Sequence, residues 1–427
     1  MMPRRFVLCA TPNHGHSAPL LALARRLVGD GHEVVFFTTG HYRERAEATG
    51  ARFVPFDPSY DAHDLMVANP EREDTRGVRG LKDDLRRIFL GPVPGQFADL
   101  QQILDGFPAD AVVVDAMFLA GLPLALRRQG TKPVLACLGV MPYAASSRDT
   151  ALFGTRLHPG TTPLHRARHA ALRWLALHVA LRDMQGLAQR VVAECGSPRL
   201  PDYFVDVMPQ VADTFLQACT PGFEYPRSDL PPSVRFVGPI LAPPSSHFDQ
   251  PSWWGQLDGG RPVVHVTQGT LDNADLGRLL GPALRGLAGE DVLVVATTGG
   301  PDPALAGDLP ANVRLERFIP HDILLPKVDV MVTNGGYGGV QQALANGVPL
   351  VVAGDSEDKP EVAARVQWSG TGVNLHTGRP SPARIRRAVR RVLAHPSYRG
   401  RAQVLGAEIA ATRPLDTITE VLLELTG

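Results

Sequence analysis

The sequence predicts an α/β protein of two doubly wound, Rossmann-like domains that face each other across a cleft. Each half of the 427-residue chain alternates short apolar runs with amphipathic helical stretches, the pattern of parallel strands covered by helices on both faces. Between the halves, residues 220–261 are rich in Pro and Gly and predict a linker with one short strand, at 234–238. The chain is too long for one ordinary core, and this break separates its two halves. Both observations favour two domains.

The first half opens with a βαβ unit. Residues 5–10 (RFVLCA) predict a strand, 11–19 a loop that carries two histidines, and 20–31 an amphipathic helix. Further strands are predicted at 32–39, 51–56, 110–117 and 132–139, with a helix at 121–130.

The same order begins again after the break. Strands are predicted at 262–270, 291–298, 313–319, 328–334 and 348–354, and helices at 276–287 and 340–345. In such sheets ligands bind outside the carboxyl ends of the strands. The histidine loop of the first half and the glycine-rich loops of the second half are therefore expected to face one shared cleft.

Two stretches do not follow this order. Residues 57–95 are polar and Pro-rich and predict a loop with one short helix. Residues 162–195 have helical periodicity and predict an amphipathic helix packed on the first domain. Basic residues along this stretch leave contact with a membrane surface as the alternative. They are Arg166, Arg168, Arg173 and Arg182.

Composition and charge exclude several classes of function. Lys+Arg (43) and Asp+Glu (43) balance, so no overall field favours nucleic acid or an anionic membrane. No apolar run is long enough to predict membrane insertion, and the four scattered cysteines are typical of a reduced, cytoplasmic protein. No Asp-x-Asp occurs, which removes one common way of holding a divalent metal at a diphosphate.

A glycine-rich stretch, VTNGGYGG at residues 332–339, lies between a predicted strand and a predicted helix. Glycines in this position let backbone amides approach an anion, and the helix N-terminus adds partial positive charge. The alternative is a tight turn that requires positive φ. The glycines alone leave both interpretations open.

Three segments together carry a family resemblance: ATPNHGHSAPLLALARRLVGDGHEVVFFTT, VTQGT, and FIPHDILLPKVDVMVTNGGYGGVQQALANGVPLVVAG with EDKPEVAARV. They resemble GT-B nucleotide-sugar glycosyltransferases, in particular the UDP/TDP-sugar transferases that decorate macrolides and other natural products. The resemblance implies four parts. These are an N-terminal acceptor-binding domain (1–222), a linker (223–260), a C-terminal nucleotide-sugar-binding domain (261–405), and C-terminal helices (406–427) that pack back on the first domain.

The resemblance implies His16 as the general base and Asp115 as the carboxylate that orients it. Chemically, an imidazole poised near neutral pH can take the proton of an acceptor hydroxyl. A buried carboxylate on the far ring nitrogen would fix the tautomer and stabilise the imidazolium. His14 is the alternative base, and either histidine could instead serve only in the loop or as a helix cap.

The resemblance also implies a donor site in the second half. Glycines of the 335–339 stretch and Thr270 would hold the diphosphate, an aromatic at 318 would stack on the base, and Asp358 with its neighbour would grip sugar hydroxyls. Phe318 could instead be core, and Asp358 a helix cap. The implied donor-binding residues are Thr270, Phe318, Ile319, His321, Asn334, Gly335, Gly336, Tyr337, Gly338, Gly339, Gln342, Asp358 and Lys359.

The sequence departs from the family pattern within this site. His321 replaces the usual Gln, Asn334 stands where most members have a His that donates to phosphate, and Gln342 stands where a Glu accepts from ribose. Lys359 brings a cation where the family has Gln. We expect compensation, in which Lys359 supplies the positive charge lost at Asn334.

The resulting expectation is an inverting glycosyltransferase that needs no metal or other cofactor. It would move a sugar from a UDP- or TDP-sugar to a hydroxyl of a hydrophobic small molecule, such as a polyketide, terpenoid or phenolic compound. A GT-B-like sugar-nucleotide epimerase and a non-catalytic nucleotide-sugar-binding partner protein are the alternatives. A dinucleotide-dependent oxidoreductase fits poorly, because the glycines lack the GxGxxG register. Monomer and homodimer both remain open.

Overall fold

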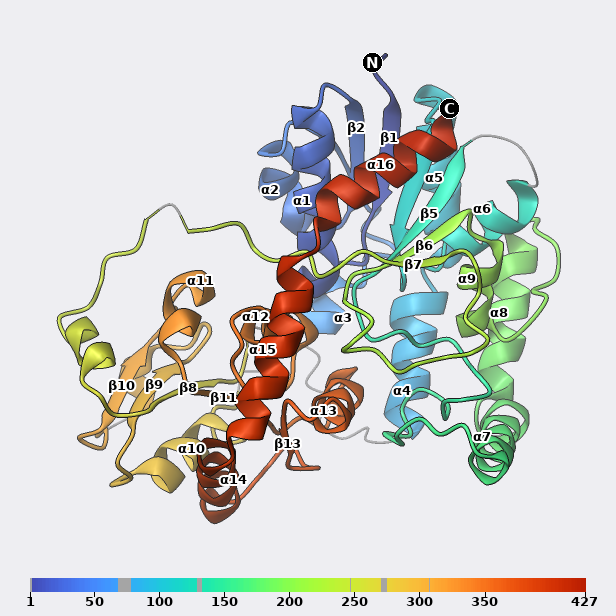
Figure 1. The fold of residues 1–427 in the computed structure, drawn as a ribbon. Helices are drawn as coiled ribbons and strands as arrows, with labels where there is room; N and C mark the ends of the chain where they lie inside the picture. Colours follow the sequence, from blue (N-terminus) through green and yellow to red (C-terminus); the bar gives the residue numbers. More distant parts are fainter. Residues whose placement is uncertain (1, 68–77, 129–132, 246, 270–274, 307) are drawn as a thin grey trace.

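The computed structural model describes residues 2–67, 78–128, 133–245, 247–269, 275–306 and 308–427. It contains two parallel sheets, one in each half of the chain (Figure 1). The first has seven strands in the order β3-β2-β1-β4-β5-β6-β7, and the second has six in the order β10-β9-β8-β11-β12-β13. The predicted fold class, two doubly wound α/β domains, is confirmed.

The strands are short apolar runs, mostly buried on both faces, as parallel sheets require. Those of the first sheet are β1 (Arg5–Cys9), β2 (Glu33–Thr38), β3 (Arg52–Pro55), β4 (Ala111–Asp115), β5 (Val134–Gly139), β6 (Thr214–Gln217) and β7 (Val234–Phe236). Those of the second sheet are β8 (Val263–Thr267), β9 (Leu293–Thr297), β10 (Val313–Glu316), β11 (Val330–Thr333), β12 (Leu350–Val352) and β13 (Gly372–Asn374).

Strand β7 lies where the sequence predicts a short strand within the linker. It pairs with β6 in the register Phe215↔Val234 and so extends the first sheet. The expected linker, 223–260, therefore begins inside the first domain. Strands β6 and β13, which the sequence analysis did not predict, are only four and three residues long.

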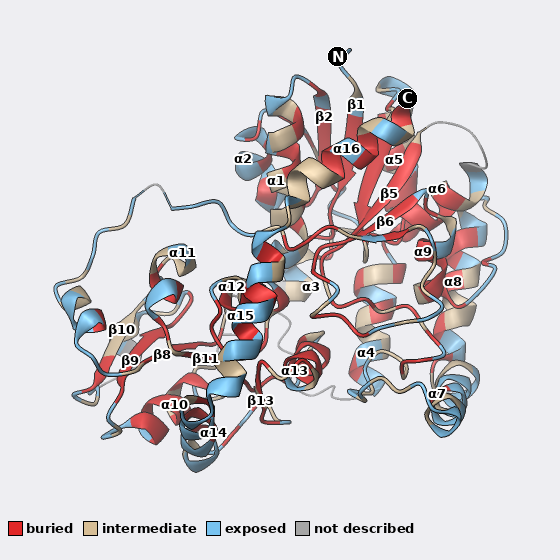
Figure 2. Cartoon of the chain, viewed as in Figure 1, coloured by how far each residue is buried: buried red, intermediate tan, exposed pale blue. Residues whose placement is uncertain are grey.

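Helices cover both faces of each sheet, and hydrophobic clusters fill the space between (Figure 2). In the first half they are α1 (His14–Gly29), α2 (Arg43–Glu47), α3 (His63–Val67), α4 (Val78–Asp84), α5 (Val93–Gly106), α6 (Gly121–Arg128), α7 (Pro163–Leu175), α8 (Arg182–Glu194) and α9 (Phe204–Val211). In the second half they are α10 (Leu280–Leu287), α11 (His321–Leu324), α12 (Tyr337–Ala345), α13 (Lys359–Trp368), α14 (Pro382–Ala394), α15 (Pro396–Ala410) and α16 (Pro414–Thr426).

The last helix returns to the first domain (Figure 1). Ile418, Val421 and Leu422 of α16 are buried in the same cluster as Phe6 and Leu8 of β1. No helix in the described part of the chain is long and apolar enough to cross a membrane.

Helix α1 begins earlier than predicted, so the expected loop 11–19 is wrong over its second half. Asn13 is the N-cap, and its side chain accepts a hydrogen bond from the Gly15 amide at 2.7 Å. His14 and His16 therefore lie in the first turn of a helix. This turn sits at the carboxyl edge of the first sheet.

The two stretches without a clear pattern also differ from expectation. In place of one short helix, the described part of 57–95 contains α3, α4, a π-helical turn at Leu85–Leu90 and the start of α5. The stretch 162–195 is two helices, α7 and α8, joined by a π-helical turn at Ala176–Ala180.

Only the second of these helices packs as expected. Helix α8 buries Met184, Ala188, Val191 and Val192, whereas α7 buries only His169. Figure 2 shows α7 as a largely exposed helix at the lower corner of the first domain. The predicted packing on the first domain therefore holds for α8 and fails for α7.

Candidate active site

The first domain brings His16 and Asp115 together. Strands β1 and β4 are neighbours, so Asp115, at the carboxyl end of β4, lies beside the first turn of α1. His16 Nδ1 is 2.7 Å from Asp115 Oδ1. The carboxylate is fully buried and also accepts hydrogen bonds from the Thr11 amide, the Thr11 hydroxyl and the Met117 amide. These bonds fix its orientation toward the imidazole.

The electrostatics of this pair favour a charged carboxylate and a basic imidazole. Burial alone would lower the pKa of His16, but the charge and hydrogen bond of Asp115, with the charges of Asp358 and Glu357, raise it above the ordinary value. Burial would raise the pKa of Asp115, but His16 and the backbone donors Thr11 and Met117 lower it. His16 can therefore accept a proton while Asp115 stays ionised.

His14 has different surroundings. Its Nδ1 lies 3.4 Å from the Arg45 guanidinium, and burial together with the charge of Arg45 lowers its pKa. The geometry thus favours His16 over His14 as the base.

The second domain places Asp358 opposite His16. Asp358 and Glu357 precede α13 and lie close enough for both charges to raise the pKa of His16. Asp358 occupies the N-cap position, but its side chain makes no capping hydrogen bond, so the capping alternative has no support. Burial raises the pKa of Asp358, and the charges of Lys359 and His16 oppose that shift.

The glycine stretch serves two purposes. Gly335 has φ +90°, and a Cβ there would meet Val352 at 2.7 Å, so a turn requires this glycine. Gly336 and Gly338 have ordinary φ, and a Cβ on either would meet no protein atom within 4 Å. Helix α12 also has no side-chain cap and no acidic residue in its first turn. The first turn of α12 is therefore uncapped and partly exposed at a positive helix end, which suits an anion.

Asn334 ties this stretch to the neighbouring strand end. Its amide Nδ2 donates to the Gln268 carbonyl, and its Oδ1 accepts from the Gly336 amide at 3.4 Å. Its side-chain donor is thus engaged with protein. Thr270, the other implied diphosphate contact, lies outside the described residues.

The side chain of Tyr337 points away from the expected donor site. It is buried, and its hydroxyl accepts a hydrogen bond from Gln217 Nε2 of the first domain at 3.3 Å. Tyr337 therefore joins the two domains. If Tyr337 contacts the donor, its backbone amide is the group that remains available.

The residues expected at the base and ribose form a second group. Phe318 is 57% exposed, so the core-packing alternative is wrong and its ring is available for stacking. Ile319 is buried beside it. His321 Nδ1 lies 2.9 Å from Gln342 Oε1, which brings two of the expected residues together. Burial lowers the pKa of His321, so a neutral ring donates to Gln342.

Lys359 does not act as the compensation hypothesis requires. Its ammonium donates to the Glu357 carboxylate and to Ser356 Oγ, and its side chain is almost fully buried. Its stem lies near Gly335, because a Cβ on that glycine would be 3.8 Å from Lys359 Cβ. The charge expected at the diphosphate is therefore paired with Glu357.

A buried charge cluster between the domains escaped the sequence analysis. Arg365 of α13 donates to Glu224 of the first half through Nε (2.9 Å) and a terminal nitrogen (2.7 Å), and to Glu361 Oε2 at 3.1 Å. The other oxygen of Glu361 accepts from the Gly154 and Arg156 amides at 2.8 and 2.9 Å. Helix α13, which follows Asp358, is thereby fixed to the first domain.

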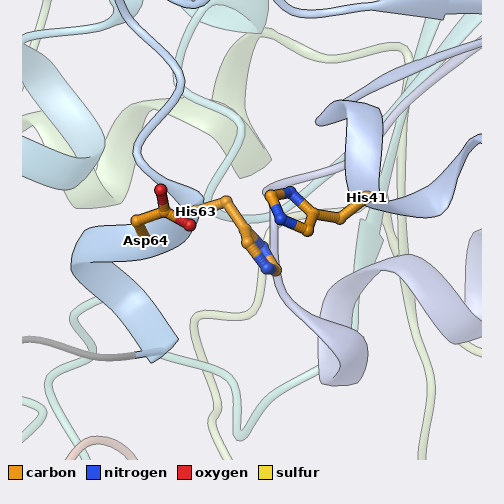
Figure 3. Close-up of side chains that lie close together, drawn as sticks. All are labelled: His41, His63 and Asp64. Atoms are coloured by element: carbon orange, nitrogen blue, oxygen red, sulfur yellow. The ribbon is translucent and has the colours of Figure 1, made fainter.

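One group of three metal-capable side chains occurs within the described ranges: His41, His63 and Asp64 (Figure 3). Their candidate ligand atoms lie within 4.8 Å of one another. The two rings are stacked, with centroids 3.9 Å apart and planes 25° apart, so their lone pairs do not converge on one point. His63 Nδ1 is also 2.9 Å from the Pro12 carbonyl. The group belongs to the first domain, whereas the glycine stretch belongs to the second.

Comparisons with known proteins show the family and the fold of the chain. Residues 283–425 match the family described as erythromycin biosynthesis protein CIII-like, C-terminal domain. The chain is 48% identical over 415 residues to 4'-demethylrebeccamycin synthase of Lentzea aerocolonigenes, covering 96% of each chain. It is 34% identical over 450 residues to UDP-glucosyltransferase 1 of Beauveria bassiana, covering 98% of this chain and 95% of that one. Among solved structures, the calicheamicin glycosyltransferase CalG4 has the same fold, with a TM-score of 0.74 at 23% identity over 100% of this chain and 98% of that one.

Proposed function

Because this chain belongs to the GT-B glycosyltransferases that act on natural products, we propose that it transfers a sugar, with inversion, from a UDP- or TDP-sugar to a hydroxyl of an apolar small molecule. The hydrogen-bonded pair of His16 and Asp115, which faces Asp358 of the second domain, carries this proposal. The relatives named as a rebeccamycin synthase and UDP-glucosyltransferases support the substrate classes.

In the proposed reaction, Nε2 of His16 takes the proton of the acceptor hydroxyl while Nδ1–H stays hydrogen-bonded to Asp115. The acceptor oxygen forms a bond to the anomeric carbon from the face opposite the nucleotide. The bond from that carbon to the diphosphate oxygen breaks, and its electron pair stays on the diphosphate. The positive end of α12 and the first-turn amides at Tyr337–Gly339 stabilise the departing charge. Asp358 binds sugar hydroxyls.

The direct test of this function is mass spectrometry of the purified protein with a panel of NDP-sugars and a mixture of hydroxylated acceptors. We expect a sugar adduct on polyketide, terpenoid or phenolic acceptors. Turnover of free sugars or proteins alone would contradict the acceptor class. Tight binding of NDP-sugar without any product would favour a non-catalytic partner protein, and interconversion of the donor sugar would favour an epimerase.

Chelation is expected to leave transfer unchanged. Backbone amides and a helix N-terminus neutralise the leaving diphosphate in this scheme, so no divalent cation is required. The measurement is the initial transfer rate with and without excess EDTA. Complete loss with EDTA, restored by Mg²⁺ or Mn²⁺, would contradict the scheme.

The transfer rate is expected to fall at acid pH. As the pH drops below the raised pKa of His16, the imidazole becomes protonated and can no longer accept the proton of the acceptor. Asp115→Asn removes the charge that does most to raise this pKa, so it should shift the acid limb of the kcat/KM profile to lower pH. It should also lower kcat, because the imidazolium loses its support. If the acid limb of the kcat/KM profile does not move in Asp115→Asn, the limb does not report the protonation of His16.

Gly338→Ala is expected to weaken donor binding without destabilising the fold. The added methyl would meet no protein atom within 4 Å, and Ala is the better helix former. It would, however, occupy the space proposed for the diphosphate. The expected cost is roughly 1–3 kcal/mol in donor binding, as for a methyl group forced into filled space.

Gly400→Ala is the matched control for this change, because Gly400 is an exposed helical glycine on α15 with equally open surroundings. It should leave the donor Kd unchanged. Equal donor Kd values for Gly338→Ala and the wild type would place the diphosphate elsewhere.

A further inference from the structure

An exposed apolar surface on the first domain is not used by the proposed reaction. Leu164, Trp174, Leu175 and Val179 are 79, 60, 51 and 61% exposed. Leu164 and Leu175 share one side of α7 with Arg168, because these positions follow three- or four-residue spacing through Ala171. Single exposed apolar residues are ordinary, but a group of them marks an interaction surface.

The same segment is strongly basic. No Asp or Glu occurs between Asp149 and Asp183, a stretch that contains five arginines. Arg166 is paired with Asp149 at 2.8 Å. Arg168, Arg173 and Arg182 are exposed, and within the described residues no carboxylate forms an ion pair with them. The surface therefore combines apolar side chains with an excess of positive charge.

Helix α4 extends this surface. Val78 and Leu81 of α4 are also exposed, and Lys82 of α4 pairs with Asp183 at the start of α8 at 2.8 Å. The ion pair holds α4 beside the end of the α7 segment. The exposed apolar residues of α4 and α7 therefore belong to one corner of the first domain (Figure 1).

We propose that this corner, the α7 surface (α4, α7 and the π-helical turn after α7), docks on an anionic lipid bilayer without crossing it. Amphipathic helices of this kind bury their apolar side chains among the headgroups while their arginines pair with lipid phosphates. A second copy of this chain is a poorer occupant, because a two-fold contact through α7 would bring arginines against arginines. Charge complementarity therefore selects the lipid surface.

If the proposed function holds, docking through α7 would also affect how acceptors reach the active site. The loop that contains Gly154 and Arg156 precedes α7 and hydrogen-bonds to Glu361 on α13, the helix that follows Asp358. A protein docked through α7 would hold this edge of the active site near the bilayer. Apolar acceptors partition into lipid, so they could then reach the site from the membrane.

The test is co-sedimentation of the full chain, without substrates, with vesicles of phosphatidylcholine alone or mixed equally with phosphatidylglycerol. We expect at least ten-fold tighter binding to the mixed vesicles, weakening as salt is added. A blue shift of the Trp174 emission, absent in Trp174→Phe, should accompany it. Arg168→Gln and Arg182→Gln should each weaken binding by roughly five-fold.

The double variant Trp174→Gln/Leu175→Gln should lose most of the binding. Val404→Gln is its matched control, because Val404 is 56% exposed on α15 of the other domain. Equal binding to both vesicles, or an equal loss in the control, would overturn the proposal. So would self-association of the wild type that the double variant abolishes. Sugar transfer to a water-soluble acceptor without vesicles should be unchanged in the double variant. If the wild type itself shows no such transfer, that result would count against the proposed function and not against the lipid docking.

Discussion

Replacing His16 with alanine is expected to lower sugar transfer by roughly 10²–10⁴-fold, the usual contribution of a positioned general base. The imidazole lies 2.7 Å from Asp115, which raises its pKa, and no other base in the described structure has this arrangement at the sheet edge. Folding should be unaffected, because Asp115 keeps its hydrogen bonds from Thr11 and Met117. The measurement is kcat at saturating donor, with the thermal unfolding midpoint as a check on folding.

His14→Ala is the natural control for this experiment. His14 lies two residues away in the same helical turn, but its partner is Arg45, whose charge lowers its pKa. We expect this variant to retain most of its activity. A crippled His14→Ala beside an active His16→Ala would move the base to His14.

The sequence allowed the fold to be predicted because its central strands are continuous apolar runs. Residues 111–115 (AVVVD) and 134–139 (VLACLG) are buried throughout, as are several strands of the second sheet, and such fully buried short runs are typical of parallel strands. Helix starts were harder to predict. The start of α1 depends on the Asn13 cap, which precedes two histidines and a glycine that have no strong helical preference.

The sequence resemblance names positions for the proposed site, but it does not give the directions of their side chains. Tyr337 lies among four glycines, yet its ring turns to Gln217 of the other domain. Lys359 follows Asp358, yet its ammonium pairs with Glu357. Each direction depends on a neighbour supplied by tertiary structure. These positions lack a periodic pattern, so a single sequence does not predict the direction of their side chains.

The α7 surface shows the same limit for packing. Helical periodicity distinguishes an apolar side from a polar side, but it does not reveal what covers the apolar side. Helix α8 packs against the core of the first domain, whereas α7 does not. A π-helical turn separates the two helices, and such turns have no reliable signature in a single sequence.

Glu224→Ala is expected to destabilise the protein by roughly 3–5 kcal/mol, the cost of leaving a buried charge without its partner. Glu224 and Arg365 are both about 1% exposed. Burial would raise the pKa of Glu224, but Arg365 and Arg227 lower it, so the carboxylate is ionised and its loss leaves both guanidinium groups underpaired. The measurement is the free energy of unfolding in urea. Lys327→Gln, which breaks the exposed pair with Asp258, is the control and should cost no more than about 1 kcal/mol.

The cluster also links stability to catalysis, since Arg365 and Glu361 lie on α13, directly after Asp358. Removing Glu224 should therefore lower transfer in the fraction that remains folded, by loosening α13 against the first domain. Arg365→Ala should cost as much stability as Glu224→Ala, and the double variant should cost at least about 1 kcal/mol less than the two losses added, because both changes remove one shared interaction. Additive losses would mean that the two side chains act independently. A stability loss of less than about 1 kcal/mol for Glu224→Ala would show that Glu361 alone satisfies Arg365 and that the link between the domains lies elsewhere.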